Sequence, residues 1–147
     1  MARRSKEKYL VLMADDSEDD CLLLKRAVSN AQRLSFIGNV SDGEELIGYL
    51  NGTGEYADRA RYPVPDLLLL DLKMPRKNGF EVLKWLQTQP FDDMVIVVLS
   101  GSDQSEDIKH ALELGADDYR LKDVDSRKRV DLVKALEEYF TKSAGQR

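Results

Sequence analysis

Four consecutive leucines, Leu67–Leu70, lie between two aspartates and restrict the folds open to this chain. Successive side chains of a strand point to opposite faces, so a run that is apolar at every position needs cover on both faces. Such runs are typical of central strands in parallel sheets that carry helices on both sides. The leucine run therefore predicts a covered parallel sheet.

Short apolar runs and longer stretches of helical period alternate along the rest of the chain. The other predicted strands are residues 9–14, 35–40, 94–100 and 118–121. The predicted helices are residues 19–30, 44–50, 78–88, 105–114 and 127–140, and residues 51–65 are predicted to form an irregular loop. Five strands that alternate with five helices form a doubly wound α/β fold, for which the flavodoxin-like strand order 2-1-3-4-5 is expected.

Apolar side chains at helical spacing identify the faces that we expect to be buried. Cys21 shares one such stripe with Leu24 and Val28, which indicates a small core residue rather than a nucleophile. His110 is expected on the solvent side of its helix. The stripes of the last two predicted helices are Ile108, Ala111 and Leu112, and then Val130, Val133, Leu136 and Phe140.

Length and charge limit the classes of function. The 147 residues suit a single domain, with a core at about residues 9–140 between a short basic N-terminal tail and a polar C-terminal tail. The net charge of −5 argues against general binding to DNA or to anionic membranes. No apolar run approaches the roughly 18 residues of a membrane span. One cysteine permits no internal disulfide, so we expect a cytoplasmic location.

Polar and charged side chains follow the predicted strands at the points where the strands end. They are Asp15, Asp16, Asp71, Ser100 and Lys122. Parallel strands end at one edge of the sheet, so we expect this set near the switch point between the first and third strands. Two like charges about 4 Å apart repel by about 4 kcal/mol at an effective dielectric near 20. Lys122 offsets only one of three carboxylates, so the set predicts a hard divalent cation such as Mg²⁺.

A carboxylate beside a divalent cation, a lysine and a hydroxyl is also suited to phosphoryl transfer. The carboxylate attacks phosphorus, while the cation and the ammonium neutralise the oxygens of the transferred group. Three further acids near strand ends, Asp19, Asp20 and Asp42, are expected to be helix N-caps or solvated turn residues.

Four motifs together resemble the receiver domains of bacterial two-component response regulators, the CheY-like family. They are Asp15-Asp16, the run Asp-Leu-Lys-Met-Pro-Arg-Lys-Asn-Gly at 71–79, Ser100-Gly101, and the run Gly-Ala-Asp-Asp-Tyr-Arg-Leu-Lys at 115–122. The resemblance covers about residues 9–140. It implies a stand-alone receiver that is a signalling protein and catalyses only its own phosphorylation and slow dephosphorylation.

The resemblance also implies the roles of the acidic residues. Asp71 corresponds to the phosphoryl acceptor, and Asp16 and Asp71 correspond to the carboxylates that bind Mg²⁺ or Mn²⁺ directly. The backbone carbonyl of Lys73 corresponds to a third metal ligand, and Asp15 to a residue that acts mostly through water. The Lys73 side chain can reach the phosphoryl group and obstruct an attacking water, so we expect slow hydrolysis.

Three further residues match the family's response to phosphorylation. Lys122 corresponds to the lysine that pairs with the phosphoryl oxygens, Ser100 to the hydroxyl that bonds them, and Tyr119 to the aromatic switch residue. The face formed by the last two helices and the fifth strand is then the output surface. We expect this face to form a symmetric dimer, with acids of one copy against bases of the other. The acids are Glu113, Asp117 and Asp118, and the bases are Arg127, Lys128 and Arg129.

Two departures from the family bear on loops and partners. Asp123 follows Lys122 where the family usually has proline, and the loop at 51–65 is longer than in minimal receivers. This loop, with Gly54-Glu55-Tyr56, resembles the regulators that pair with phytochrome-type kinases. The expected partners are a sensor histidine kinase, of phytochrome type, or a histidine phosphotransfer protein, and a downstream protein target. Nothing that resembles a DNA-binding domain follows residue 140, so output is expected through protein contacts or onward phosphotransfer.

Three alternatives share parts of this pattern. A flavin- or nucleotide-binding protein has the same fold, but the acidic loop at 15–20 would repel a phosphate unless a metal were present. A phosphatase of the haloacid dehalogenase type needs a second acid two residues after its nucleophile, where this chain has Lys73. A pseudo-receiver keeps the fold without being phosphorylated, and a phosphorylation assay separates it from a true receiver.

Overall fold

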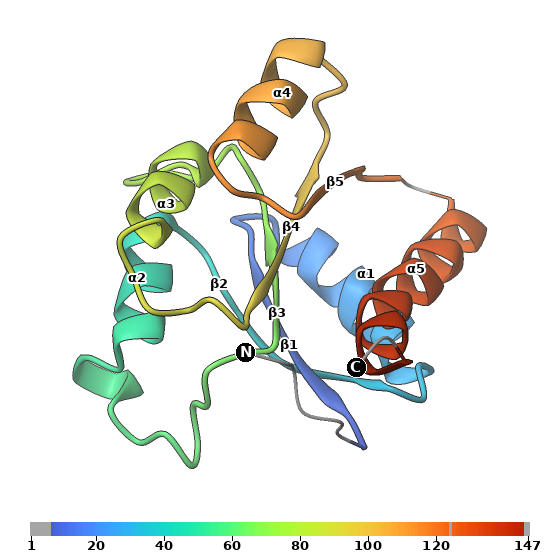
Figure 1. The fold of residues 1–147 in the computed structure, drawn as a ribbon, viewed down its shortest axis with the longest axis horizontal. Helices are drawn as coiled ribbons and strands as arrows, with labels where there is room; N and C mark the ends of the chain where they lie inside the picture. The colour runs from blue at the N-terminus through green and yellow to red at the C-terminus, as the bar shows by residue number, and fades with distance from the viewer. Residues whose placement is uncertain (1–6, 124, 146–147) are drawn as a thin grey trace.

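A five-stranded parallel sheet lies at the centre of the computed structural model, which describes residues 7–123 and 125–145 (Figure 1). Its strands are β1 (Tyr9–Ala14), β2 (Leu34–Val40), β3 (Leu67–Leu70), β4 (Val95–Ser100) and β5 (Asp118–Leu121). They lie in the order β2-β1-β3-β4-β5, and every neighbouring pair is parallel. The predicted flavodoxin-like order is confirmed. Residues 1–6 of the predicted basic tail lie outside the described residues.

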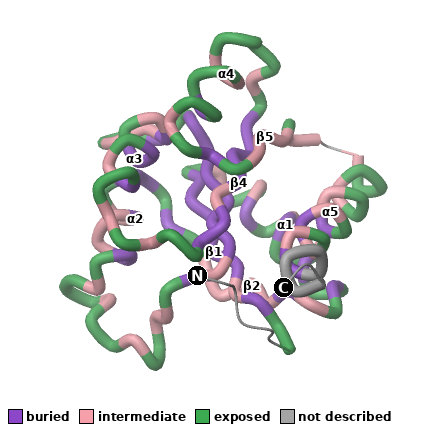
Figure 2. Tube along the Cα trace, in the orientation of Figure 1, coloured by how far each residue is buried: buried purple, intermediate pink, exposed green. Residues whose placement is uncertain are grey.

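Helices cover both faces of the sheet. They are α1 (Glu18–Ser29), α2 (Gly43–Asn51), α3 (Gly79–Leu86), α4 (Ser105–Glu113) and α5 (Ser126–Gly145). In Figure 1, α2 and α3 lie on one side of the sheet and α1 and α5 on the other. Leu68 and Leu70 pack toward α2, α3 and α4, whereas Leu67 and Leu69 pack toward α1 and α5. All four leucines are fully buried, as the run predicts, and Figure 2 shows burial concentrated along the central strands of the sheet.

The predicted core stripes hold for most positions but fail at two. Cys21, Leu24 and Val28 are buried, as expected. Leu112 on α4 and Val130 on α5 are instead 44% and 50% exposed. α4 packs against β5, the edge strand of the sheet, and Leu112 and Val130 belong to neither of the two buried core clusters.

His110 is exposed, as predicted, and its ring stacks on Phe80 of α3 with 4.6 Å between centroids. No helix within the described residues combines the length and the hydropathy that a bilayer crossing needs.

The loop at 51–65 is more ordered than predicted. It contains a short 3-10 helix, η1 (Gly54–Tyr56), and the rings of Tyr49, Tyr56 and Tyr62 contact one another. The Arg59 guanidinium donates to the carbonyls of Tyr49, Leu50 and Tyr62. Two of these carbonyls belong to the last turn of α2, so Arg59 satisfies acceptors that a helix C-terminus leaves open.

Candidate functional site

Backbone hydrogen bonds between neighbouring strands continue for one residue past the ends of the strands. These bonds position two of the predicted site residues, Asp71 and Lys122. The Asp71 N–H donates to the carbonyl of Ala14 at 2.9 Å, which holds the residue after β3 beside the end of β1. The Lys122 N–H donates to the carbonyl of Ser100 at 2.8 Å, which links the ends of β5 and β4. Asp71 and Ser100 are buried, at 5% and 1% exposed. The strand ends therefore converge at the switch point, as the sequence predicts.

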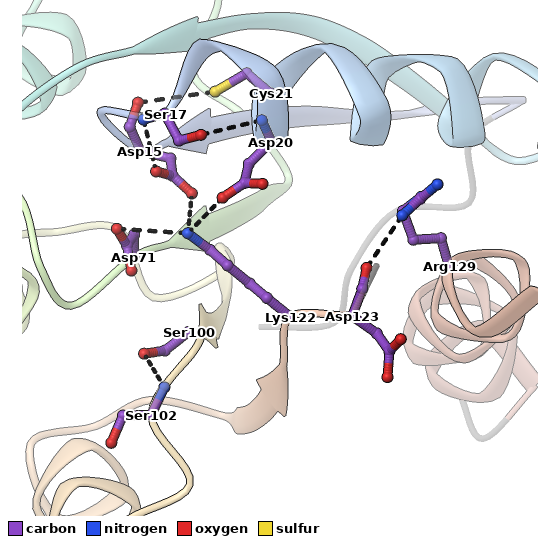
Figure 3. A network of polar contacts seen from close by, with 10 residues as sticks. All are labelled: Asp15, Ser17, Asp20, Cys21, Asp71, Ser100, Ser102, Lys122, Asp123 and Arg129. Atoms are coloured by element: carbon purple, nitrogen blue, oxygen red, sulfur yellow. Dashed lines mark hydrogen bonds and ion pairs between the residues drawn. The ribbon is translucent and has the colours of Figure 1, made fainter. Parts of the chain in front are cut away.

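The Lys122 ammonium lies among three carboxylates (Figure 3). Its Nζ is 2.6 Å from Asp15 Oδ2, 2.9 Å from Asp20 Oδ2 and 3.7 Å from Asp71 Oδ2. Burial lowers the pKa of Lys122, but hydrogen bonds to Asp15 and Asp20 and the charge of Asp71 outweigh this and raise it. The lysine therefore remains a cation at physiological pH.

Asp20 corrects one prediction, because it is neither an N-cap nor a solvated turn residue. Ser17 is the N-cap of α1, and its Oγ accepts the Asp20 N–H at 3.2 Å. Asp20 is thus in the first turn of α1, and its carboxylate turns toward Lys122. A serine followed three residues later by an acid is a start signal for a helix, and it could have placed Asp20 there.

Asp15 is held on both of its oxygens. Oδ1 accepts the Ser17 N–H at 2.9 Å, and Oδ2 contacts Lys122. Its backbone carbonyl accepts the thiol of Cys21, with 3.7 Å between sulfur and oxygen. Burial, followed by the charges of Asp15 and Asp20, raises the pKa of Cys21 to about 12. The thiol is therefore a protonated packing group, as predicted.

Carboxylate oxygens of Asp15, Asp16 and Asp71 lie within 4.8 Å of one another. Burial and the Asp15 charge raise the pKa of Asp71 to about 6, although Lys122 and the Lys73 N–H lower it. With Asp20, the site holds four carboxylates against the one ammonium of Lys122, which contacts three of them, so the site carries excess negative charge. An oxygen-only donor set of this charge fits a hard divalent cation such as Mg²⁺ or Mn²⁺.

The two predicted switch residues both contact Ser102, which the sequence analysis did not single out. The Ser102 N–H donates to Ser100 Oγ at 3.1 Å, and the Tyr119 hydroxyl donates to the Ser102 carbonyl at 2.7 Å. Ser102 Oγ donates to Asp107 at 2.6 Å, which ties the same loop to α4. The loop after β4 therefore connects the site edge to β5 and α4.

The segment after Asp71 is held by a glycine contact and by an ion pair. A Cβ on Gly79 would lie 2.5 Å from the Asp71 carbonyl oxygen, so only glycine permits this approach of α3. Arg76 has a φ of 66° and its Nη2 lies 2.7 Å from Oδ2 of the buried Asp42. Asp42 also caps α2 by accepting the Glu45 N–H, which confirms its predicted N-cap role.

The fold and this arrangement define a class: flavodoxin-like proteins with an acidic, lysine-containing site at the switch point instead of a phosphate-binding loop. The model of the response regulator receiver domain matches residues 11–136. The chain therefore belongs to the receiver domain family. This membership decides against the flavin-binding and dehalogenase-type alternatives.

Known relatives fall into two groups by length. The nitrate/nitrite response regulator protein NarL of Escherichia coli (strain K12) is 36% identical over 132 residues, which are 90% of this chain and 55% of NarL. The chain thus spans about half the length of that relative. Response regulator Rcp1 of Synechocystis sp. is 27% identical over 141 residues, and the match covers 95% of this chain and 94% of Rcp1.

Solved structures give the same fold. The phosphorylated cyanobacterial phytochrome response regulator RcpA superposes with a TM-score of 0.80 at 32% identity, over 91% of this chain and 94% of RcpA. The Mn(2+)-bound form of Rcp1 superposes with a TM-score of 0.76 at 28% identity, over 90% and 94% of the two chains. The chain is therefore similar in sequence, length and fold to single-domain phytochrome response regulators.

Proposed function

We propose that this chain is a phosphorylation switch in which Asp71 accepts a phosphoryl group from a histidine kinase or a histidine phosphotransfer protein. The observation that carries the proposal is the surroundings of Asp71. Its carboxylate is buried at the switch point, within 4.8 Å of two other carboxylates and 3.7 Å from the Lys122 ammonium. A nucleophile beside a cation site and a fixed ammonium is suited to an incoming phosphoryl group.

In the proposed reaction a carboxylate oxygen of Asp71 attacks the phosphorus of a phosphohistidine. The new oxygen–phosphorus bond forms as the phosphorus–nitrogen bond breaks, and the imidazole leaves with the electron pair and takes a proton. Asp15, Asp16, Asp71 and the Lys73 carbonyl would hold Mg²⁺ or Mn²⁺, which supplies positive charge to the phosphoryl oxygens. Lys122 would pair with one of these oxygens.

Two side chains would act after the transfer. The Ser100 hydroxyl would donate to a phosphoryl oxygen, and its bond with the Ser102 N–H would move with it. The Tyr119 hydroxyl, which bonds to the Ser102 carbonyl, would then change its position. A phosphoryl group thus biases the loop and α4 between two arrangements. The exposed Lys73 side chain would slow hydrolysis by pairing with the phosphoryl oxygens.

The relatives support the proposed partners. Rcp1 and RcpA match nearly the whole chain, and RcpA is described as a phytochrome response regulator. We extend this to a kinase of phytochrome type for the present chain. A downstream protein that binds the α4-β5-α5 face would receive the signal.

A homodimer through the α4-β5-α5 face would rest on apolar contact more than on charge. Arg127 pairs with Asp125 and Lys128 pairs with Asp123 within the same chain, so these bases already have partners. Among the described residues of α4, β5 and α5, the large apolar side chains that are exposed are Leu112, Leu121 and Val130. Exposed ion pairs contribute only about 0–1 kcal/mol each, so they would set register while the apolar residues supply affinity.

Labelling with a small phosphodonor tests the proposal. The wild-type protein with acetyl phosphate and Mg²⁺ is expected to gain one acid-labile phosphoryl group, and EDTA should prevent this. Asp71→Asn removes the nucleophile at constant size and should abolish labelling. Asp16→Ala removes one metal ligand and should weaken Mg²⁺ binding and labelling together. Full labelling of Asp71→Asn, or labelling in EDTA at the rate seen with Mg²⁺, would refute the proposal.

A further inference from the structure

Lys122 is held by a residue that belongs to no strand end. Asp15 and Asp71 reach it from β1 and β3, whereas Asp20 reaches it from the first turn of α1. The Asp20 contact, at 2.9 Å, is shorter than the Asp71 contact, at 3.7 Å. The lysine therefore lies closer to Asp15 and Asp20 than to the proposed acceptor.

Asp20 does not belong to the group of carboxylates that could hold a metal ion. The carboxylates that lie within 4.8 Å of one another are those of Asp15, Asp16 and Asp71, and Asp20 is not among them in the described part of the chain. Its side chain is 38% exposed, against 0% for Asp15 and 7% for Asp71. A change at Asp20 thus alters the lysine's surroundings and keeps all three clustered carboxylates.

We infer that Asp20 is a positioning residue that restrains Lys122 and thereby limits how tightly the site binds a phosphoryl group. This inference rests on the proposed phosphorylation of Asp71. The Lys122 Nζ forms short ion pairs with Asp15 and Asp20, at 2.6 Å and 2.9 Å. A phosphoryl group adds about −1.5 to −2 charge and strong acceptor oxygens. The phosphoryl oxygens and the Asp20 carboxylate would then compete for the charge of Lys122, and the two anions repel each other.

The neighbouring residue supplies a matched control. Asp19 carries the same charge in the same helical turn, is exposed, and is not one of the three carboxylates that form ion pairs with Lys122 in the described part of the chain. Asp20→Asn removes the charge of one of the two carboxylates nearest to the Lys122 ammonium and keeps Asp15, whereas Asp19→Asn removes a charge that does not contact the lysine. Asp20→Glu keeps the charge and can still reach the lysine.

The test is calorimetric titration with beryllofluoride, a phosphoryl mimic, at saturating Mg²⁺. Asp20→Asn is expected to bind the mimic about three- to tenfold more tightly than wild type, because one competing charge is lost near the ligand. Asp19→Asn should change the Kd by less than about twofold. Asp20→Glu should restore the wild-type Kd, which a merely structural loss at this position would not do. Asp20→Ala provides a second variant if Asp20→Asn does not fold.

The outcomes separate the inference from the proposed function. Equal or weaker binding by Asp20→Asn, or an equal gain in Asp19→Asn, overturns the role of Asp20. If wild type binds the mimic and Asp71→Asn does not, the proposed function stands in either case. A wild-type protein that does not bind the mimic with Mg²⁺ overturns both.

Discussion

Replacing Asp71 by asparagine is expected to stabilise the metal-free protein by an amount that grows with pH. Burial and the charge of Asp15 raise the pKa of Asp71 from 3.8 to about 6, against the opposing effect of Lys122. The residue is only 5% exposed, so solvent screens this effect little. Two pKa units or slightly more correspond to about 3 kcal/mol of unfolding free energy. Asparagine keeps the size of the side chain and removes this cost.

The pH range follows from the direction of the shift. Below about pH 4 the Asp71 carboxyl is protonated in both the folded and the unfolded chain, so it costs nothing. As pH rises from about 4 to about 6, the unfolded chain ionises first, and the folded protein loses stability. The advantage of Asp71→Asn should therefore grow from about 1.6 kcal/mol at pH 5 to about 3 kcal/mol at pH 7.5. Asp42, whose pKa is lowered, affects both proteins equally and cancels in the difference.

Urea unfolding in EDTA at pH 5, 6 and 7.5 measures this difference. Asp19→Asn is the control, since it makes the same chemical change at an exposed position and should stay within about 0.5 kcal/mol of wild type at each pH. An Asp71→Asn variant that is less stable than wild type would refute the reasoning. So would an advantage that does not change between pH 5 and pH 7.5.

Two further substitutions and one thiol reaction test the surroundings of buried side chains. Phe140 is 1% exposed, and its ring stacks on Tyr9 with 4.1 Å between centroids. Phe140→Ala should therefore lower the free energy of unfolding in urea by about 3–5 kcal/mol. A loss below about 1 kcal/mol would contradict this packing. Burial raises the pKa of Cys21 to about 12. The reaction of its thiol with a disulfide reagent at pH 8 should therefore be at least ~100-fold slower in the folded protein than in the unfolded protein. Equal rates would show an accessible thiolate. Arg76→Ala leaves the buried Asp42 without its cation and should lower the urea midpoint of unfolding, and an unchanged midpoint would mean that this pair contributes nothing.

The strand order could be predicted because it depends on local patterns. A leucine run that is apolar on both faces, and the alternation of strands with helices, leave few arrangements of a small sheet. The same logic places Asp15, Asp71 and Lys122 at one edge, because all three follow strands. These are the residues that the structure brings into contact.

The features that the sequence did not predict depend on how the helices pack against the sheet. Asp20 contacts Lys122 only because α1 begins at Glu18 and its first turn lies over the edge of the sheet. Leu112 and Val130 match a helical stripe but are exposed, and neither belongs to a buried core cluster. Helical period shows which residues share a face, but it does not show how much of that face a neighbour covers.

Chemical trapping of the phosphorylated residue tests the central claim most directly. Borohydride reduces an acyl phosphate to an alcohol, so it converts a phosphorylated aspartate to homoserine, which peptide mass spectrometry locates. After treatment with acetyl phosphate and Mg²⁺, the protein is expected to carry homoserine at position 71, and aspartate should remain at 15, 16 and 20. Conversion at one of those three positions, or at none, would contradict the assignment of Asp71 as the phosphoryl acceptor.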